Sequence, residues 1–197
     1  MGGSAASELA RFLGPGPGLA YVYGRVDDGT RDTGGRGVVS GLAQDASGAL
    51  VIREAFAIPS GASRTGFIES SRECRLRVEG RDLVQSTPDG DVVLLRAPLR
   101  VGTAWTRPVV GYVAESGPWR GEIHCRIAMI ESVPVFGETR LTVRVIGHAR
   151  LPVGDAVLTE QHAAGIGLVL RREQVGDLAS YEIVLEEIRE EPGGARG

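Results

Sequence analysis

The sequence contains no lysine and no asparagine, so arginine supplies all 22 of its basic side chains. A chain without asparagine cannot carry an N-linked glycan, because that modification needs an Asn acceptor. Nucleotide bias in a GC-rich genome is the simplest source of both absences. They therefore exclude one modification and indicate no function.

Charge of one sign is nowhere concentrated. The formal net charge is −3 and the sequence pI is about 5.7. Proteins that bind nucleic acid present a concentrated basic face to the phosphates, so no nucleic-acid partner is expected. Two arginine pairs, Arg75 with Arg77 and Arg171 with Arg172, could form a local basic patch. We interpret both pairs as solvated strand faces.

Long apolar runs are missing too. No stretch approaches the roughly 20 residues that a membrane-spanning helix needs. The segment after Met1 has neither the basic start nor the apolar run of a signal peptide. Two interpretations of the compartment remain open: a cytosolic chain, or a mature exported chain in which Met1 replaces the export signal.

The two ends of the chain differ in composition from its middle. Residues 1–18 are expected to form a leader, with a short helix from Ala5 to Leu13 capped by Ser4. The leader ends in a Gly-Pro-Gly-Pro-Gly linker, whose prolines lack the amide donors that helices and strands need. Residues 191–197 are polar and Gly-rich, and are expected to form a flexible tail.

Between these ends, at 19–190, apolar and polar residues alternate with a period of two. The pattern is clearest in Cys74–Glu79, Glu122–Ile127 and Arg140–Val145. It predicts half-buried strands, because a helix would place residues two apart on different sides. Further strands are expected at Leu19–Val26, Gly37–Gln44, Ala49–Ile58, Thr65–Ser71, Leu83–Ser86, Val92–Arg96, Val109–Glu115, Ala156–Gln161, Gly167–Glu173 and Ser180–Ile188.

Many short strands without long helical crossovers predict a single all-β domain at 19–190. It would be an antiparallel sandwich, barrel or half-barrel with at most one short N-terminal helix. A break near 97–108, which carries Pro98, Gly102 and Pro108, is expected to divide the strands into two groups.

The two cysteines, Cys74 and Cys125, fall on the apolar sides of their expected strands. If those strands face each other, a disulfide could close a loop of about 50 residues and stabilise the fold by roughly 4 kcal/mol in the chain-entropy model. It would indicate an oxidising compartment. The alternative is two separate buried thiols that pack as small hydrophobes. The sequence leaves both alternatives open.

No pattern of catalytic or metal-binding residues emerges, so neither a catalytic residue nor a metal or cofactor is assigned. His124, His148 and His162 lack the spacing of metal ligands, and no Cys-x-x-Cys pair is present. His162 is expected in a turn. The paired carboxylates lie in turns or near the chain end, so no carboxylate is expected in the shielded cleft that acid–base catalysis needs.

Trp105 and Trp119 are the candidate ligand-binding residues. Each lies beside a Gly/Pro-rich turn, and aromatic side chains often line ligand pockets. The alternative, which we favour, is that each tryptophan plugs the end of a β core.

Three segments resemble a group of uncharacterised bacterial envelope lipoproteins. They are Leu94–Trp105, which contains Val-Gly-Thr-Ala-Trp, Trp119–Cys125, and His162–Val169. Their order and spacing are similar to those of the group over the second half of the chain. His162 and Ala164 depart from the group's usual aromatic residue and proline. The resemblance implies a β-rich, exported and often lipid-anchored protein, and it implies no reaction.

These observations lead to one functional expectation. We expect a non-enzymatic cell-envelope module, in the periplasm or anchored as a lipoprotein in the outer membrane, that binds an apolar small molecule or another envelope protein. Membrane contact would be made only through a lipid anchor that this chain lacks. The alternatives are a structural subunit of a larger envelope assembly, a cytoplasmic location and, with least support, a hydrolase whose catalytic groups are scattered in the sequence.

Overall fold

A computed structural model describes residues 4–27, 35–59, 67–113, 117–151, 154–175 and 179–191. Met1 and the expected tail beyond Glu191 lie outside this part of the chain. The described elements are one helix, α1 (Ala5–Ala10), and twelve strands: β1 (Leu19–Asp27), β2 (Arg36–Gln44), β3 (Leu50–Pro59), β4 (Phe67–Glu79), β5 (Asp82–Thr87), β6 (Gly90–Arg96), β7 (Ala104–Val113), β8 (Gly117–Val135), β9 (Glu138–Leu151), β10 (Gly154–Ala163), β11 (Gly167–Val175) and β12 (Ala179–Glu190). No helix in the described ranges is long and apolar enough to cross a membrane.

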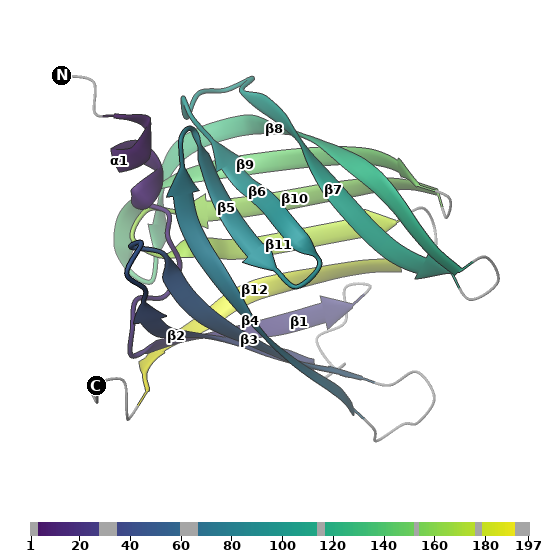
Figure 1. The fold of residues 1–197 in the computed structure, drawn as a ribbon, viewed down its shortest axis with the longest axis horizontal. Coiled ribbons are helices and arrows are strands. Elements are labelled where there is room, and N and C mark those ends of the chain that lie inside the picture. Colours follow the sequence, from purple (N-terminus) through teal and green to yellow (C-terminus); the bar gives the residue numbers. More distant parts are fainter. Residues whose placement is uncertain are drawn as a thin grey trace.

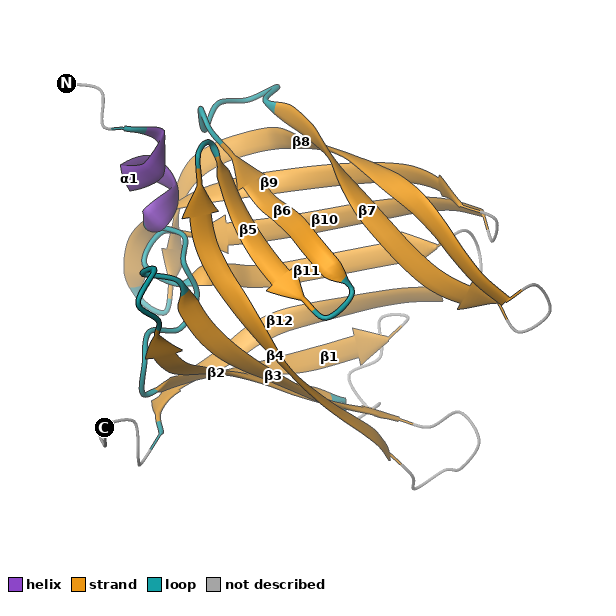
Figure 2. Cartoon of the chain, in the orientation of Figure 1, coloured by secondary structure: helices purple, strands orange, loops and turns teal. Residues whose placement is uncertain are grey.

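All twelve strands belong to one antiparallel sheet with the order β6-β5-β4-β3-β2-β1-β12-β11-β10-β9-β8-β7. The sheet curls into a nearly closed barrel, and α1 lies at one end of it (Figures 1 and 2). The expected all-β class with one short N-terminal helix is therefore confirmed, and the barrel is the form that the sheet adopts.

The two edge strands, β6 and β7, are consecutive in the chain but do not pair through their backbones. Side chains join them instead. The Trp105 indole Nε1 donates a hydrogen bond to the Val93 carbonyl at 3.0 Å, and the Arg107 Nη2 donates one to the Leu94 carbonyl at 2.9 Å. We call this junction the seam. It coincides with the sequence break near 97–108.

The strands form where the period of two places apolar side chains on the inside. In β9, Val143 and Val145 are fully buried, whereas Arg144 between them is partly exposed. β4 differs from expectation, because one strand of 13 residues replaces the two expected at 65–71 and 74–79. The polar residues at 71–73 continue the strand, and Arg72 bonds to Glu54 on the neighbouring β3.

The described part of the expected leader packs against the end of the barrel. Ser4 caps α1 by accepting a hydrogen bond from the Ser7 amide, and Leu9 and Phe12 are buried in a core cluster with Leu95 and Ile127. Burying two such side chains stabilises this contact by roughly 3–6 kcal/mol before the entropy cost of ordering the segment. The segment therefore closes one end of the barrel.

The Gly/Pro stretch at 14–18 fits this end because glycine faces it from the sheet. A Cβ atom on Gly41 would overlap the backbone oxygens of Pro15 and Gly16, and one on Gly167 would lie 3.0 Å from the Gly14 Cα. The absence of side chains lets the backbones approach closely. The expected linker thus packs against the sheet, and Gly41 and Gly167 are the glycines that permit this approach.

Candidate functional site

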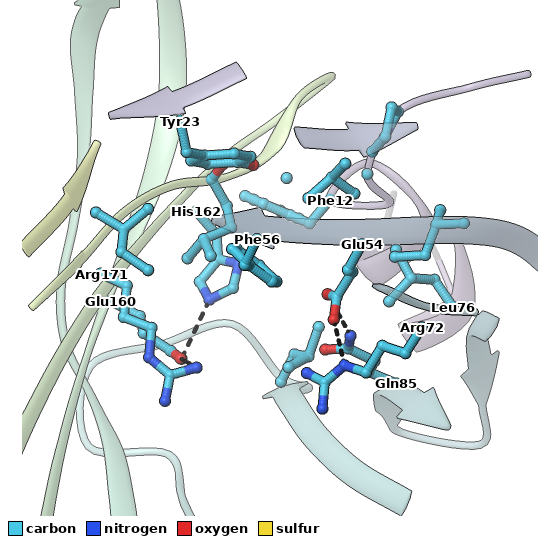
Figure 3. Close-up of a pocket in the computed structure, with 18 residues that line it drawn as sticks. Phe12, Tyr23, Glu54, Phe56, Arg72, Leu76, Gln85, Glu160, His162 and Arg171 are labelled. Carbon is cyan, nitrogen blue, oxygen red and sulfur yellow. Dashed lines mark hydrogen bonds and ion pairs between the residues drawn. The ribbon is translucent and has the colours of Figure 1, made fainter. Parts of the chain in front are cut away.

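A cavity of about 130 Å³ lies inside the barrel, between the N-terminal segment and the middle of the sheet. We call it the inner cavity (Figure 3). One part of its wall is apolar, with side chains from the leader, β2, β3, β4, β6 and β12. These are Phe12, Val39, Ile52, Leu76, Leu94 and Ile183. The rest of the lining is polar and forms two clusters, one around Glu160 and one around Glu54, so the cavity suits a molecule with both kinds of surface.

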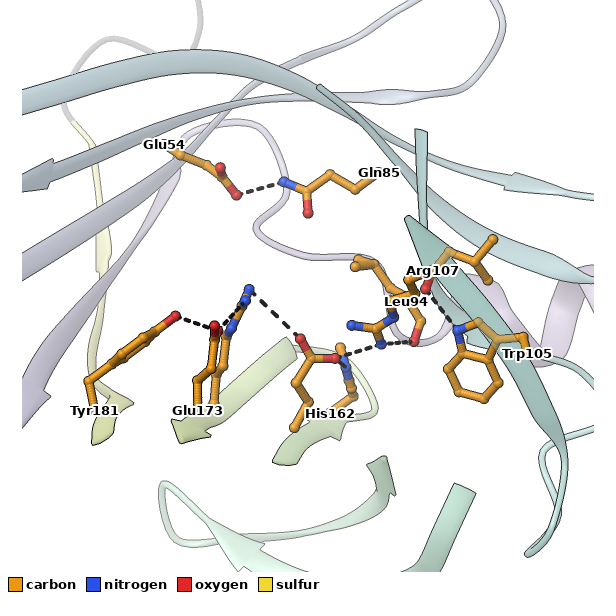
Figure 4. A network of polar contacts seen from close by, with 11 residues as sticks. Glu54, Gln85, Leu94, Trp105, Arg107, His162, Glu173 and Tyr181 are labelled. Carbon is orange, nitrogen blue, oxygen red and sulfur yellow. Dashed lines mark hydrogen bonds and ion pairs between the residues drawn. The ribbon is translucent and has the colours of Figure 1, made fainter. Parts of the chain in front are cut away.

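Glu160 is the centre of the first polar cluster of the lining and lies beside His162 (Figure 3), and Figure 4 shows how the cluster continues through Arg107 toward Leu94. Glu160 lies on β10 and is 2% exposed, and its Oε2 accepts a hydrogen bond from the Arg107 Nη2 of β7 at 2.7 Å. His162, two residues along β10, places its Nε2 3.5 Å from the same oxygen, and Arg171 of β11 places its Nη1 3.9 Å from Oε1. One buried carboxylate thus joins three strands.

The charge of this cluster is set by competition between burial and its cationic neighbours. Burial alone raises the pKa of the Glu160 carboxyl, but Arg107, the contact with His162, and Arg171 together outweigh it and hold that pKa well below its ordinary value. Glu160 is therefore ionised inside the barrel, where a paired carboxylate can remain charged.

Glu54 of β3 forms the second polar cluster. Its Oε2 accepts a hydrogen bond from the Arg72 Nε at 2.7 Å, and its Oε1 accepts one from the Gln85 Nε2 at 2.7 Å. The Cys74 thiol lies 3.6 Å from Oε2, and burial followed by the Glu54 charge raises the pKa of that thiol. A raised pKa disfavours the thiolate, so Cys74 is a poor nucleophile.

Two side chains that line the inner cavity carry a buried nitrogen atom without a hydrogen-bond partner among the described residues. They are Arg171, through its Nε, and His162, through its Nε2. The contact from His162 to Glu160 is too long for a hydrogen bond. A buried donor without an acceptor costs about 1–3 kcal/mol. These atoms are therefore poised to bond to a molecule in the cavity.

A second space of about 300 Å³, the outer cavity, lies beside the inner one. Arg25, Arg36, Arg72 and Arg171 line it, together with Tyr181. The Arg25 guanidinium lies 4.6 Å from the centre of the Tyr181 ring. The Tyr181 hydroxyl donates to Glu173 at 2.7 Å, and burial raises its pKa to about 12, so it stays protonated.

The candidate tryptophans lie away from the inner cavity. Trp105 is 5% exposed, packs in the core cluster beneath α1 and bonds across the seam. Trp119 packs beside Ala149, Leu151 and Ala156. Neither lines the inner or the outer cavity. Each packs among apolar side chains, and a role of either in ligand binding stays a prediction.

Cys74 and Cys125 are both buried and free. They belong to separate core clusters, Cys74 beside Ile52 and Cys125 beside Trp105. The structure thus has two separate thiols where the sequence also left a disulfide open. The physical reason is that β4 and β8 face different parts of the interior, each with its own apolar neighbours.

The histidines are not brought together as a metal site. His124 and His148 are opposed on β8 and β9 and are exposed, whereas His162 is buried at the inner cavity. The described residues contain no group of three or more His, Cys, Asp or Glu that could hold a metal ion. His162 lies in β10, not in the expected turn, because the strand extends to Ala163.

Sequence reasoning missed the buried charges. No shielded carboxylate was expected, and this expectation is wrong for Glu160 and Glu54, which are 2% and 9% exposed. Arg171 was interpreted as part of a solvated face, but it lines both cavities. The signal was present in the period of two, because Leu158, Glu160 and His162 share one strand face.

The lining offers binding groups and lacks a conventional nucleophile. Among the described residues that line the inner cavity there is no serine, threonine or cysteine. Its one hydroxyl, that of Tyr23, donates to the Leu168 carbonyl at 2.8 Å, and burial raises its pKa. A protonated, hydrogen-bonded phenol is a poor nucleophile. The arrangement can hold a molecule by apolar contact and by hydrogen bonds from cationic groups.

Comparison with solved structures places this fold among bacterial proteins with the same architecture. A candidate exported protein with a YmcC-like fold from Bacteroides fragilis has a TM-score of 0.56 and 15% identity, and the match covers 91% of this chain and 100% of that one. A candidate lipoprotein from Parabacteroides distasonis has a TM-score of 0.51 and 11% identity, with 90% and 98% covered. At these identities the likeness establishes a shared fold.

No protein-family model matches the sequence, and no curated protein matches it.

Proposed function

We propose that this chain is a non-enzymatic binding module of the bacterial cell envelope, and that the interior of its barrel holds a small, partly apolar molecule. The observation that carries the proposal is the inner cavity, a space lined by both apolar and polar side chains, in which buried nitrogen atoms of His162 and Arg171 lack hydrogen-bond partners. Such a combination is typical of a ligand site, where apolar walls supply affinity and a few polar groups fix orientation.

The size of the inner cavity limits its occupant. A cavity of about 130 Å³ is close to the roughly 150 Å³ engineered cavity that binds benzene. It therefore accommodates an apolar group of about six carbon atoms. The outer cavity borders the inner one, because Phe56, Arg72, Arg171 and Ile183 line both, and we propose that a longer molecule extends into it.

Two findings support the envelope as the compartment. Both matching structures belong to proteins named as exported or as a lipoprotein, and their fold extends over nearly the whole of this chain. The three segments that resemble envelope lipoproteins lie in the same fold, at the seam, on β8 and around His162. The proposal predicts that the native protein fractionates with the cell envelope of its bacterium, and recovery in the cytosol contradicts it.

The alternative functions have less support. A structural subunit that assembles through strand edges needs an open edge, but β6 and β7 face each other across the seam and share hydrogen bonds. A hydrolase needs a nucleophile beside the buried His162 and Glu160, and the lining of the inner cavity supplies no serine, threonine or cysteine.

Isothermal titration calorimetry with three six-carbon probes tests ligand binding. The probes are 1-hexanol, hexanoate and hexylamine. We expect at least one to bind the wild type and to bind Val39→Phe at least tenfold more weakly, because the larger ring fills the inner cavity that Val39 lines. Val38→Phe is the matched control, since Val38 precedes it on β2 and is absent from the lining of both cavities. If no probe binds the wild type, or Val39→Phe binds all three as the wild type does, the proposed function is wrong.

A further inference from the structure

Four arginines line the outer cavity although the chain as a whole is acidic. The two cavities together are lined by four arginines, Arg25, Arg36, Arg72 and Arg171, and by two glutamates, Glu54 and Glu160. With His162 neutral, their formal charge is +2, whereas that of the whole chain is −3. All four arginines line the outer cavity and neither glutamate does. The four arginines are therefore gathered at the outer cavity, where Arg72 is paired with Glu54 and Arg171 with Glu173.

The two cavities differ in their linings. The inner cavity has apolar side chains such as Phe12 and Val39 beside its two polar clusters, whereas four arginines and no carboxylate are among the described residues that line the outer cavity. Arg72 and Arg171 line both cavities. A molecule that spans the two spaces would meet apolar contacts at one end and positive charge at the other.

The unpartnered nitrogen of Arg171 adds a second observation. Its Nε is buried and has no acceptor among the described residues, although its Nη2 donates to Glu173 at 2.9 Å. An anionic oxygen at the junction of the two cavities would supply that acceptor. Guanidinium groups form strong, charge-assisted hydrogen bonds with such oxygens.

We propose that the ligand is an anionic amphiphile, with an apolar group of about six carbons in the inner cavity and its anionic head among Arg25, Arg36, Arg72 and Arg171. This inference rests on the proposed function, because it names the chemical class of the molecule that the same interior would hold. The head group is recognised by its charge, and the apolar group by the shape of the inner cavity.

The three probes separate the head group from the apolar group. We expect hexanoate to bind the wild type at least tenfold more tightly than 1-hexanol at pH 7 and low salt, and hexylamine to bind most weakly. Salt screens the attraction between the head group and the arginines. Raising the salt concentration from about 0.05 to about 0.5 M should therefore weaken the binding of hexanoate several-fold and leave that of 1-hexanol unchanged. This comparison uses the wild type alone, so it does not depend on the folding of any variant.

Arg36→Gln tests the outer cavity directly. Arg36 is exposed and lines only the outer cavity, so its replacement should weaken hexanoate about fivefold and spare 1-hexanol. Arg53→Gln is the matched control. It removes the same charge from an exposed position on β3, and Arg53 lines neither cavity. Hexanoate that binds no more tightly than 1-hexanol, or that Arg53→Gln weakens as much as Arg36→Gln, overturns this inference. The proposed function stands in that case if Val39→Phe abolishes binding of 1-hexanol.

Discussion

Replacement of Arg107 by methionine should destabilise the protein strongly, because it leaves Glu160 charged and buried without its nearest partner. The two side chains are 5% and 3% exposed, and their Nη2 and Oε2 atoms are 2.7 Å apart. Breaking a buried ion pair by removing one partner costs about 3–5 kcal/mol. The same change also removes the hydrogen bond to Leu94 across the seam. For a chain of this length the loss corresponds to a decrease in Tm of roughly 10 °C.

The free energy of unfolding is measured by urea denaturation, with tryptophan fluorescence as the signal. Arg126→Met is the control, since Arg126 is exposed on β8 and its loss should change stability by less than about 0.5 kcal/mol. A double variant, Arg107→Met with Glu160→Gln, removes both charges. Because the penalty comes from the unpaired charge, the double variant should be at least as stable as Arg107→Met alone. The coupling between the two sites should then be about 2 kcal/mol.

The pH dependence provides an independent check on the same pair. The pKa of Glu160 is lowered in the folded state, so the stability it contributes is present above its ordinary value of 4.5 and is lost as the pH falls through the folded-state pKa. In Arg107→Met the main cationic neighbour is gone, and protonation of Glu160 relieves the buried charge. The difference in stability between wild type and variant should therefore shrink as the pH falls below 4.5. Arg107→Met that loses less than about 1 kcal/mol, or a double variant that loses the full sum of the single losses, would refute the reasoning.

Three further predictions concern the thiols, the barrel end and the seam. Cys74 and Cys125 should not react with a thiol reagent in the native protein, because both are buried and burial raises the pKa of each thiol. Both should react in denaturant without reductant, and the absence of a reactive thiol under those conditions would reveal a disulfide. Gly41→Ala should destabilise the protein by about 1–3 kcal/mol in urea denaturation, because its Cβ would overlap the backbone of the N-terminal segment, and an unchanged midpoint would argue against close packing there. Trp105→Phe should lower the free energy of unfolding by about 1–2 kcal/mol, because the Val93 carbonyl loses its donor across the seam. If Trp119→Phe lowers it equally, the loss does not come from the hydrogen bond at the seam.

The strands could be predicted from the sequence because each lies partly against the core and partly against solvent. The alternation of apolar and polar residues in Glu122–Ile127 and Arg140–Val145 predicts such half-buried strands, and both segments are strands in the structure. The break near 97–108 also has a physical meaning, because the chain there passes from one edge of the sheet to the other.

The candidate site could be predicted only in part. Alternation places Glu160 and His162 on the same side of β10 as Leu158, so their burial could have been inferred from the strand alone. Their partner Arg107 could not, because it lies 53 positions away on a strand that is not adjacent in the sheet. The closure of the barrel brings the two together, and no local pattern encodes that distance.

The packing of the leader was equally hidden. Gly-Pro-Gly-Pro-Gly favours neither helix nor strand, and alone it is typical of a linker. Its position depends on Gly41 and Gly167 in the sheet, whose lack of side chains creates room for it. The contact is therefore a property of pairs of segments far apart in the sequence.

The strand order has a consequence for synthesis of the protein at the ribosome. β1–β6 and β7–β12 are two groups in which each strand pairs with its neighbours in the chain, and only the pairing of β1 with β12 joins the groups, linking Leu19 to Glu190. A nascent chain therefore exposes the free edge of β1 until residues 179–190 have emerged. Open strand edges pair readily with other chains, so the unfinished molecule carries a risk of aggregation at this edge.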